Sequence, residues 1–160
     1  MADMFIAYTT AAGIDKKVEF DTDEEVINLD LRDIAEIDLL PLVWAENLEV
    51  LCLRHNRIGE LDLSPLSKCK KLEMLSLSDN LIKRIDLSPL ADCQNLTELA
   101  LDMNPLESVD ISPLFECPKL DELRIDDDVA LKADLFLRSI GDWPQVLVDL
   151  YPRILWKASG

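Results

Sequence analysis

The middle of the chain repeats one pattern of apolar and polar residues every 24 positions. Within each copy a short stretch such as Leu75-Ser76-Leu77 alternates apolar and polar residues, which predicts a strand with one buried face. Residues of the same kind stand one period earlier and one period later, so at least three consecutive copies are present. The positions that recur in the clearest copy are Leu72, Leu75, Leu77, Asn80, Ile82, Ile85, Asp86, Leu87, Ser88, Pro89, Leu90 and Cys93.

These positions carry the motif L-x-x-L-x-L-x-x-N-x-L, and over about residues 25–128 the chain resembles the leucine-rich-repeat family. The resemblance implies an α/β solenoid: a right-handed coil with a parallel concave sheet and short helical turns on the convex side. One coil of this size cannot bury its own leucines, so stacked coils share a core and become stable together. The repeat is most similar to intracellular arrays of archaeal or other microbial proteins, and the family implies a role in binding other proteins.

Two polar features recur at fixed places in the repeat. Asn56, Asn80 and Asn104 stand where the chain turns away from each predicted strand. An inward amide there can donate to and accept from backbone groups that the turn leaves unpaired, so we expect a structural asparagine ladder. On the return leg, the recurring pair Ser88-Pro89 places a hydroxyl just before a proline. This pair predicts a single turn of α or 3₁₀ helix, capped by the serine hydroxyl, in each coil.

The length of 160 residues predicts one leucine-rich-repeat domain, residues 1–160. We divide it into an N-terminal cap (residues 1–25), about five coils (26–128) and a C-terminal cap (129–160). The first coil is degenerate, with Arg32 at the ladder position and Leu40 at the serine position. Terminal coils are often atypical, so these departures do not disturb the fold assignment.

The two caps are less regular in sequence. Residues 5–14 suit either a short helix or a strand, and residues 17–20 alternate like a strand. Residues 130–140 have helix-forming composition and end at Gly141, and a second helix is predicted from Asp142 to about Tyr151. We therefore expect a helical C-terminal cap on the last coil, with an exposed apolar helix that binds a partner as the alternative.

The charge of the chain restricts its partners. The formal net charge is −16 and the isoelectric point is about 4.3, which argues against nucleic acid and anionic membrane surfaces. A basic protein, a basic peptide or a cation is electrostatically easier to bind, although acidity can also serve solubility alone. No secretory signal and no membrane-spanning stretch is visible, so we expect a cytoplasmic location.

Three of the four cysteines share one repeat position. Cys69, Cys93 and Cys117 recur 24 residues apart, and the preceding copy has Ala45 there. A position that accepts Cys or Ala is most simply a small buried slot, which predicts reduced thiols. The chain has no C-x-x-C pair and one histidine, so a zinc site is not expected.

In the family, partners usually engage the concave face, which is formed by side chains beside the strand leucines. A basic and apolar early end and an acidic late end are predicted for this face, and Met74 and Met103 add adaptable apolar contacts. Cys52, Ser76 and Ala100 form a column of small side chains that leaves room for a helix or loop. The alternative is that the exposed carboxylates are merely solvated. Mapped onto this chain, the candidate partner-binding residues are Val50, Cys52, Arg54, His55, Met74, Ser76, Ser78, Asp79, Glu98, Ala100, Asp102, Met103, Glu122, Arg124, Asp126 and Asp127.

Other candidate chemistry is weak. The recurring Asp38, Asp62, Asp86 and Asp110 suggest either a metal ladder or, as we favour, a structural or solubility role. The acidic run 126–128 lacks the glycine and glutamate of a calcium loop. A thiol–imidazole pair between Cys52 and His55 is the one catalytic arrangement the sequence offers, and no phosphate-binding glycine loop or cofactor motif accompanies it.

The sequence therefore predicts a monomeric, non-enzymatic protein-interaction module without a cofactor or metal, which binds its partner through a partly acidic concave face. Two alternatives stay open. The first is an inhibitor or regulator of a basic enzyme. The second is a structural scaffold subunit that uses its caps and convex side.

Overall fold

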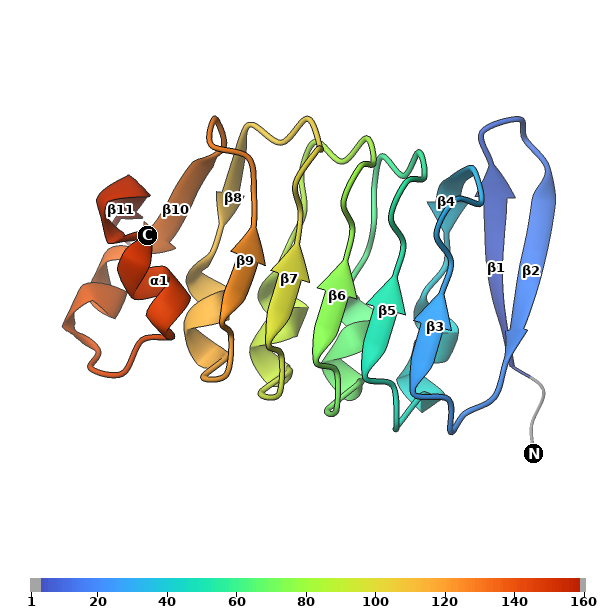
Figure 1. Cartoon of the computed structure of the whole chain (residues 1–160), viewed down its shortest axis with the longest axis horizontal. Helices are drawn as coiled ribbons and strands as arrows, with labels where there is room; N and C mark the ends of the chain where they lie inside the picture. The colour runs from blue at the N-terminus through green and yellow to red at the C-terminus, as the bar shows by residue number, and fades with distance from the viewer. Residues whose placement is uncertain (1–3, 159–160) are drawn as a thin grey trace.

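Successive coils of the chain lie side by side, and each contributes one short strand to a parallel sheet (Figure 1). The computed structural model describes residues 4–158. Strand partners in this sheet are 24 residues apart, so that Leu51 lies beside Leu75 and Leu75 beside Leu99. The register predicted from the repeat is confirmed. The five strands, in order across the sheet, are β3 (Val26–Asn28), β5 (Val50–Cys52), β6 (Met74–Ser76), β7 (Glu98–Ala100) and β9 (Glu122–Arg124).

The inward side chains of the coils form one continuous core. Leu51, Leu75 and Leu99 expose none of their surface, and the asparagines of the ladder are buried beside them. Removing each such leucine from water stabilises the fold by about 1.5–3 kcal/mol. Alternation along the strands thus separates a buried leucine face from the face turned away from the core, as the sequence predicts.

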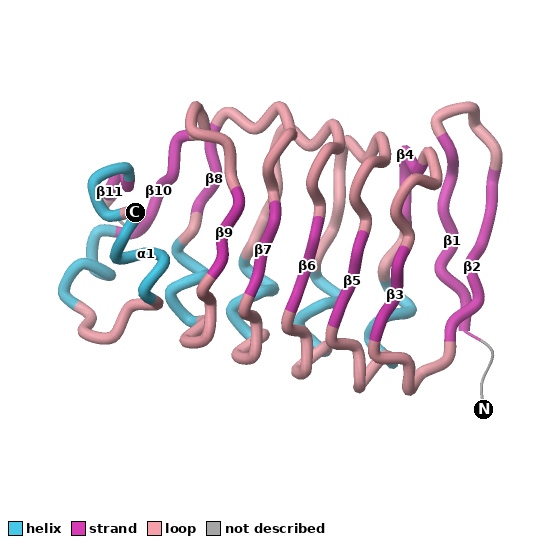
Figure 2. Tube along the Cα trace, in the orientation of Figure 1, coloured by secondary structure: helices cyan, strands magenta, loops and turns pink. Residues whose placement is uncertain are grey.

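The return side of the coils carries four short 3₁₀ helices behind the sheet (Figure 2). The helical turns are confirmed, but the predicted serine cap is wrong, because no serine side chain caps its helix. Instead the carboxylate of Asp86 accepts a hydrogen bond from the backbone N–H of Ser88, at 2.9 Å. Leu40 can therefore replace the serine, since its own N–H donates to Asp38 at 3.0 Å. These helices are η1 (Leu40–Trp44), η2 (Ser64–Lys68), η3 (Ser88–Asp92) and η4 (Ser112–Glu116).

The repeated cysteines line a buried slot behind these helices, as predicted. All four cysteines are free, and Cys69, Cys93 and Cys117 expose none of their surface. Each of these three thiols lies near the backbone carbonyl of a leucine 27 residues earlier, and the Cys93 Sγ is 3.3 Å from the Leu66 oxygen. Burial raises the pKa of Cys93 to about 12, so the thiol stays protonated.

The N-terminal end of the stack is a hairpin. β1 (Met4–Thr10) pairs antiparallel with β2 (Asp15–Phe20) on one side and with β4 (Ile34–Ile37) of the first coil on the other. The open choice between helix and strand for residues 5–14 is settled as a strand and a turn. Gly13, with φ at +82°, supplies the left-handed backbone that this turn requires.

The C-terminal segment is only in part the helical cap that the sequence predicts: α1 lies inside the second predicted helix, but strands form both ends of the segment. Its first part, β10 (Ala130–Asp134), is a strand that pairs in parallel with β8 (Ser108–Asp110) and with β11 (Ile154–Lys157). The predicted helix over residues 130–140 is wrong in its first half because pairing with β8 overrides local helix preference. The remaining elements are η5 (Leu135–Ser139), α1 (Gln145–Asp149) and η6 (Tyr151–Arg153).

Aromatic side chains hold the C-terminal segment together. Trp143 packs edge-on against Phe115 of η4, with ring centroids 5.2 Å apart, and lies 5.4 Å from Trp156 of β11. Such contacts anchor the segment to the last complete coil. Among residues 4–158 no helix is both long and apolar enough to cross a membrane.

Candidate partner-binding surface

The predicted partner-binding residues lie on or beside the concave sheet, but they differ in how much surface they offer. His55, Met103, Arg124 and Asp127 are exposed. Half-buried positions are Val50, Arg54, Met74, Asp79, Glu98, Asp102, Glu122 and Asp126. The buried positions are Cys52, Ser76, Ser78 and Ala100.

The column of small side chains is buried and does not form an open channel for a helix or loop. Cys52 exposes 6% of its surface, Ser76 1% and Ala100 3%, because taller neighbours stand around them. Ser78, which the sequence maps to the partner-binding face, is also buried, since it exposes 8% of its surface. A partner on this face would therefore contact the taller side chains of the flanking columns.

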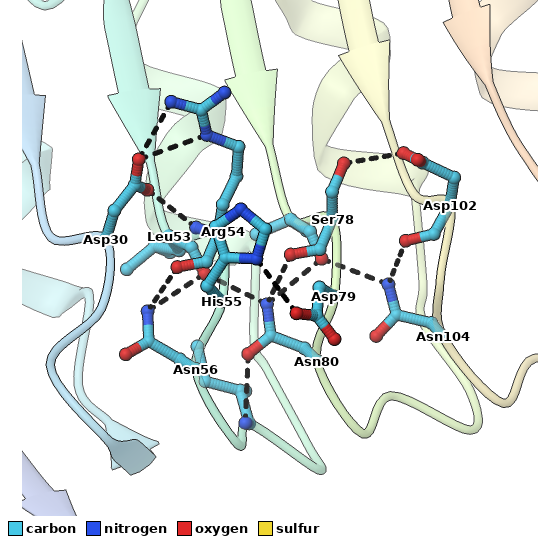
Figure 3. A network of polar contacts seen from close by, with 12 residues as sticks. Asp30, Leu53, Arg54, His55, Asn56, Ser78, Asp79, Asn80, Asp102 and Asn104 are labelled. Carbon is cyan, nitrogen blue, oxygen red and sulfur yellow. Dashed lines mark hydrogen bonds and ion pairs between the residues drawn. The ribbon is translucent and has the colours of Figure 1, made fainter.

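Asp30, Arg54, Ser78 and Asp102 occupy matching positions just after successive strands, and we call them the upper row. Hydrogen bonds between neighbouring coils hold this row in place (Figure 3). The Asp30 carboxylate accepts bonds from the Arg54 guanidinium at 2.9 and 3.0 Å and from the Arg54 backbone N–H at 2.7 Å. This charge-assisted arrangement fixes Arg54 in place and neutralises it. The basic early end of the face, predicted from Arg54, is consequently weaker than the sequence indicates.

Two carboxylates of the predicted acidic end are also engaged within the protein. The Ser78 hydroxyl donates to Asp102 at 2.5 Å (Figure 3). The Asp126 carboxylate accepts from the backbone N–H of Met103 at 3.0 Å. Asp102 and Asp126 thus stabilise the turns that leave the strands, and part of their capacity to accept hydrogen bonds from a partner is already used.

The rim beyond this row has left-handed backbone at successive coils. His55, Asp79 and Met103 have φ of +58°, +57° and +59° although none is glycine. Inter-coil backbone bonds hold the conformation, for example from the His55 N–H to the Ser78 carbonyl at 3.0 Å. The His55 Nδ1 also lies 2.8 Å from an Asp79 carboxylate oxygen. The thiol–imidazole pair is therefore not what the geometry favours, because the imidazole bonds to Asp79.

Cys52 itself is a poor nucleophile in this setting. Its burial, followed by the nearby charge of Asp30, raises the pKa of the thiol above its ordinary value. Because the thiolate is the reactive form, a raised pKa lowers reactivity at neutral pH.

The asparagine ladder lies directly under the rim (Figure 3). Asn80 donates to the carbonyl of Leu53, one coil earlier, at 2.9 Å and to that of Leu77 at 3.0 Å. Its oxygen accepts from the backbone N–H of Ile58 at 3.0 Å. The ladder is confirmed, and it fixes the spacing between coils that positions the concave side chains.

Two carboxylates on the strands themselves, those of Glu98 and Glu122, have fewer neutralising partners within the protein. Glu98 and Glu122 lie side by side on β7 and β9. A hydrogen bond with Glu122, together with burial and repulsion, raises the pKa of Glu98, whereas that hydrogen bond and Arg124 lower the pKa of Glu122. These opposite directions mean that, as the pH falls, Glu98 takes up a proton before Glu122 does. Arg124, 3.2 Å from Glu122, is the one cation bonded to this pair among residues 4–158.

A second acidic column was missed by the sequence reasoning. Glu25, Glu49 and Glu73 each stand just before a strand, and Asp121 takes the same place in the last coil. Backbone bonds such as that from the Glu73 N–H to the Glu49 carbonyl, at 2.8 Å, stack these positions. A hydrogen bond with Glu73, burial and the charge of Glu25 raise the pKa of Glu49. The signal was present, since four of the five coils have an acidic residue at this position and only Thr97 interrupts the series.

The outer aspartate column has the structural role that we favoured. Its carboxylates bind the backbone N–H two residues ahead, as Asp62 does with Ser64 at 2.9 Å. The Ser64 hydroxyl and N–H lower the pKa of Asp62. Within residues 4–158 no group of three or more His, Cys, Asp or Glu side chains is arranged to hold a metal ion.

Comparison with known proteins places the repeats in a family. The family described as "Leucine rich repeat" matches residues 46–106. No curated protein sequence matches significantly. Among solved structures, internalin C2 from Listeria monocytogenes is 33% identical, with a TM-score of 0.48, over 66% of this chain and 50% of its own.

Two plant structures are also similar. The ectodomain of the receptor kinase SOBIR1 from Arabidopsis thaliana has a TM-score of 0.59 at 17% identity, over 98% of this chain and 79% of its own. The ectodomain of GASSHO1/SCHENGEN3 from Arabidopsis thaliana, in complex with CASPARIAN STRIP INTEGRITY FACTOR 2, is 28% identical with a TM-score of 0.50. That match covers 58% of this chain and 11% of the ectodomain, so the chain spans half or less of the internalin and of this receptor.

Proposed function

The chain is a leucine-rich-repeat protein, and we propose that it is a non-enzymatic interaction module that binds a basic segment of another protein through its concave face. The observation that carries this proposal is the pair of stacked carboxylates Glu98 and Glu122, whose pKa values move in opposite directions. A second stacked pair, Glu49 and Glu73, lies just before strands β5 and β6 of the same sheet, and the pKa of Glu49 is raised.

Stacked carboxylates favour a cationic ligand for a physical reason. Adjacent strands are about 4.7–4.9 Å apart, so like charges at matching positions repel each other in the unliganded protein. A lysine or arginine side chain between Glu98 and Glu122 would relieve this repulsion and form charge-assisted hydrogen bonds. In the upper row Asp30 and Asp102 already have partners. These residues would therefore attract a cationic ligand less strongly than Glu98 and Glu122 and would mainly shape the surface.

A related repeat array supports the binding of a protein ligand. The GASSHO1/SCHENGEN3 ectodomain was solved in complex with CASPARIAN STRIP INTEGRITY FACTOR 2. Its similarity to this chain is limited to 11% of its length, so the identity of that factor does not carry over.

The geometry gives little support to catalysis. The sole histidine is bonded to Asp79, and Cys52, three residues before it in the sequence, is buried with a raised pKa. The four free cysteines suit a reducing compartment, which supports our placing the protein in the cytoplasm.

Two other functions remain as alternatives. Inhibition of a basic enzyme would use the same concave carboxylates. A scaffold role is favoured by the apolar side chains of Leu40 and Trp44 on η1, each of which exposes 61% of its surface on the convex side.

Isothermal titration with a lysine-rich peptide tests the proposed face. The double variant Glu98→Lys/Glu122→Lys should abolish binding, whereas Asp92→Lys/Glu116→Lys, on the convex helices, should retain it. Both variants change the net charge equally, so only the position of the charge differs. Equal loss in both variants would show that binding is non-specific attraction, and a glutamate-rich peptide of the same length should not bind.

A further inference from the structure

Exposed apolar side chains gather at the C-terminal end of the stack. Of fourteen large apolar side chains that are exposed among residues 4–158, six lie in the C-terminal segment. A concentration of this kind is typical of an interaction surface. These six are Leu135, Phe136, Ile140, Val148, Tyr151 and Leu155.

This end of the molecule also has an open strand edge. β11 pairs with β10 on one side and, within residues 4–158, has no strand on the other. Trp156 of β11 is held from behind by Trp143 and Tyr151, at 5.4 and 5.9 Å between ring centroids. The strand is therefore already ordered and does not need to fold before it pairs.

The usual protection of an edge is missing on β11. A charged side chain discourages edge pairing when it is free, but the one charged residue of β11, Lys157, is neutralised by Asp110 at 2.7 Å and Asp134 at 3.9 Å. The opposite end of the stack differs, because the edge strand β2 carries the exposed Lys16 and Lys17.

The charge distribution indicates which partner fits. Residues 129–160 contain four basic and three acidic residues, a net charge of +1, whereas residues 1–128 contain 12 basic and 29 acidic residues, a net charge of −17. A strongly basic or acidic partner finds little complementary charge on this segment. A second copy of the chain, which is repelled everywhere else, meets the least repulsion here.

We propose that two copies of the chain associate through this end, with β11 pairing antiparallel to β11 of the second copy across a two-fold axis. The three-stranded sheet β11-β10-β8 of each copy then continues into that of the other. Leu155, which exposes 56% of its surface, becomes covered. This proposed dimer departs from the monomer expected from the sequence, and it depends on the edge of β11, which a helical cap would not provide.

The arrangement does not depend on the proposed function. In Figure 1 the C-terminal segment lies beyond β9, at the far end of the stack from the N-terminal hairpin. The concave strands stay accessible in both copies, so a dimer would present two concave faces.

Light scattering across a concentration series tests this inference. The full chain should double in apparent mass between the micromolar and millimolar ranges. Leu155→Lys should remain monomeric while melting like the unaltered chain, and Leu31→Lys, at a side chain that is 76% exposed near the N-terminal end, should still dimerise. Hydrogen exchange should show the backbone amides of residues 154–157 becoming protected as concentration rises.

Three results would overturn the proposal: a monomer at every concentration, a dimer unaffected by Leu155→Lys, or association without protection of residues 154–157. Growth beyond a dimer would also overturn it, because a two-fold contact closes on itself. Titration of the same samples with the lysine-rich peptide measures binding to the concave face separately. Failure of the dimer proposal is therefore distinguishable from failure of the proposed function.

Discussion

The side-chain amide of Asn80 donates a hydrogen bond to the backbone carbonyl of Leu53, one coil earlier, at 2.9 Å. Its oxygen accepts from the N–H of Ile58, also in that coil, at 3.0 Å. One buried side chain thus satisfies backbone groups of two coils. Asn56 and Asn104 repeat the arrangement, so the ladder sets the distance between coils and with it the spacing of the concave columns.

Replacing Asn80 with alanine should destabilise the protein by about 1–3 kcal/mol, because buried backbone groups lose their partners. Gln94→Ala removes an exposed amide and should stay within about 0.5 kcal/mol. Urea unfolding of both variants measures the difference. Equal destabilisation would contradict the buried role of Asn80.

Asp86→Ala should cost about 0.5–1.5 kcal/mol at neutral pH, because the carboxylate accepts a hydrogen bond from the Ser88 N–H at the start of η3. Hydrogen bonds from Ser88 lower the pKa of Asp86 below its ordinary value of 3.8. The stabilisation is therefore present above pH 3.8 and is lost as pH falls through the lowered pKa. Unfolding free energies measured from pH 7 downward should converge for the two proteins in acid, and a constant difference would refute the role of the carboxylate. Asp92→Ala, an exposed carboxylate of η3, is the matched control.

The repeated thiols should be nearly inert in the folded protein. Burial raises the pKa of Cys69 to about 11 and, with added charge effects, that of Cys117 to about 12. A thiol reagent should label them only as the protein unfolds, and it should label Cys52 first because that residue is 6% exposed. Mass spectrometry after timed labelling gives the order. Rapid labelling of Cys69, Cys93 and Cys117 in native conditions would contradict the packed slot.

Glu98→Gln should make the unliganded protein more stable than the unaltered chain, and this gain should be larger at neutral pH than in acid. The folded state raises the pKa of Glu98 above 4.5, so it binds more protons than the unfolded chain just above that pH. Stability is consequently lost as pH rises through the raised pKa, and the variant avoids this loss. Thermal melts at pH 4 and pH 7 should show a larger gain at pH 7, whereas Glu116→Gln on the convex side should show no such difference. A gain independent of pH would argue against the raised pKa of Glu98.

The regular coils could be predicted from sequence because every signal in them is local and repeated. The strand stretch Leu75-Ser76-Leu77, the turn asparagine and the proline of the return helix recur at one spacing, so each copy supports the interpretation of the others. The serine cap failed because Asp86 and Ser88 both offer suitable side chains, and only the backbone geometry decides between them.

The C-terminal segment could not be predicted because its structure depends on a distant strand. Residues 130–134 have helix-forming composition, but β8 leaves an edge on which they extend instead. The N-terminal hairpin likewise takes its place from β4 of the first coil.

The candidate surface was predicted only in outline. The columns follow from the repeat, but side-chain height and inter-coil bonds determine which members are accessible. Ser78 looked exposed by its position, yet it is covered and bonded to Asp102. Glu49 and Glu73 were missed because they stand before the strand, outside the positions where the family usually binds partners.

A backbone NMR titration with a lysine-rich peptide locates the binding surface without altering the protein. If the concave face binds the peptide, the largest shifts fall on β6, β7 and β9, around Glu73, Glu98 and Glu122, while η2, η3 and η4 stay unchanged. Shifts concentrated on those convex helices, or no saturable shift at any concentration, would contradict binding through the concave face.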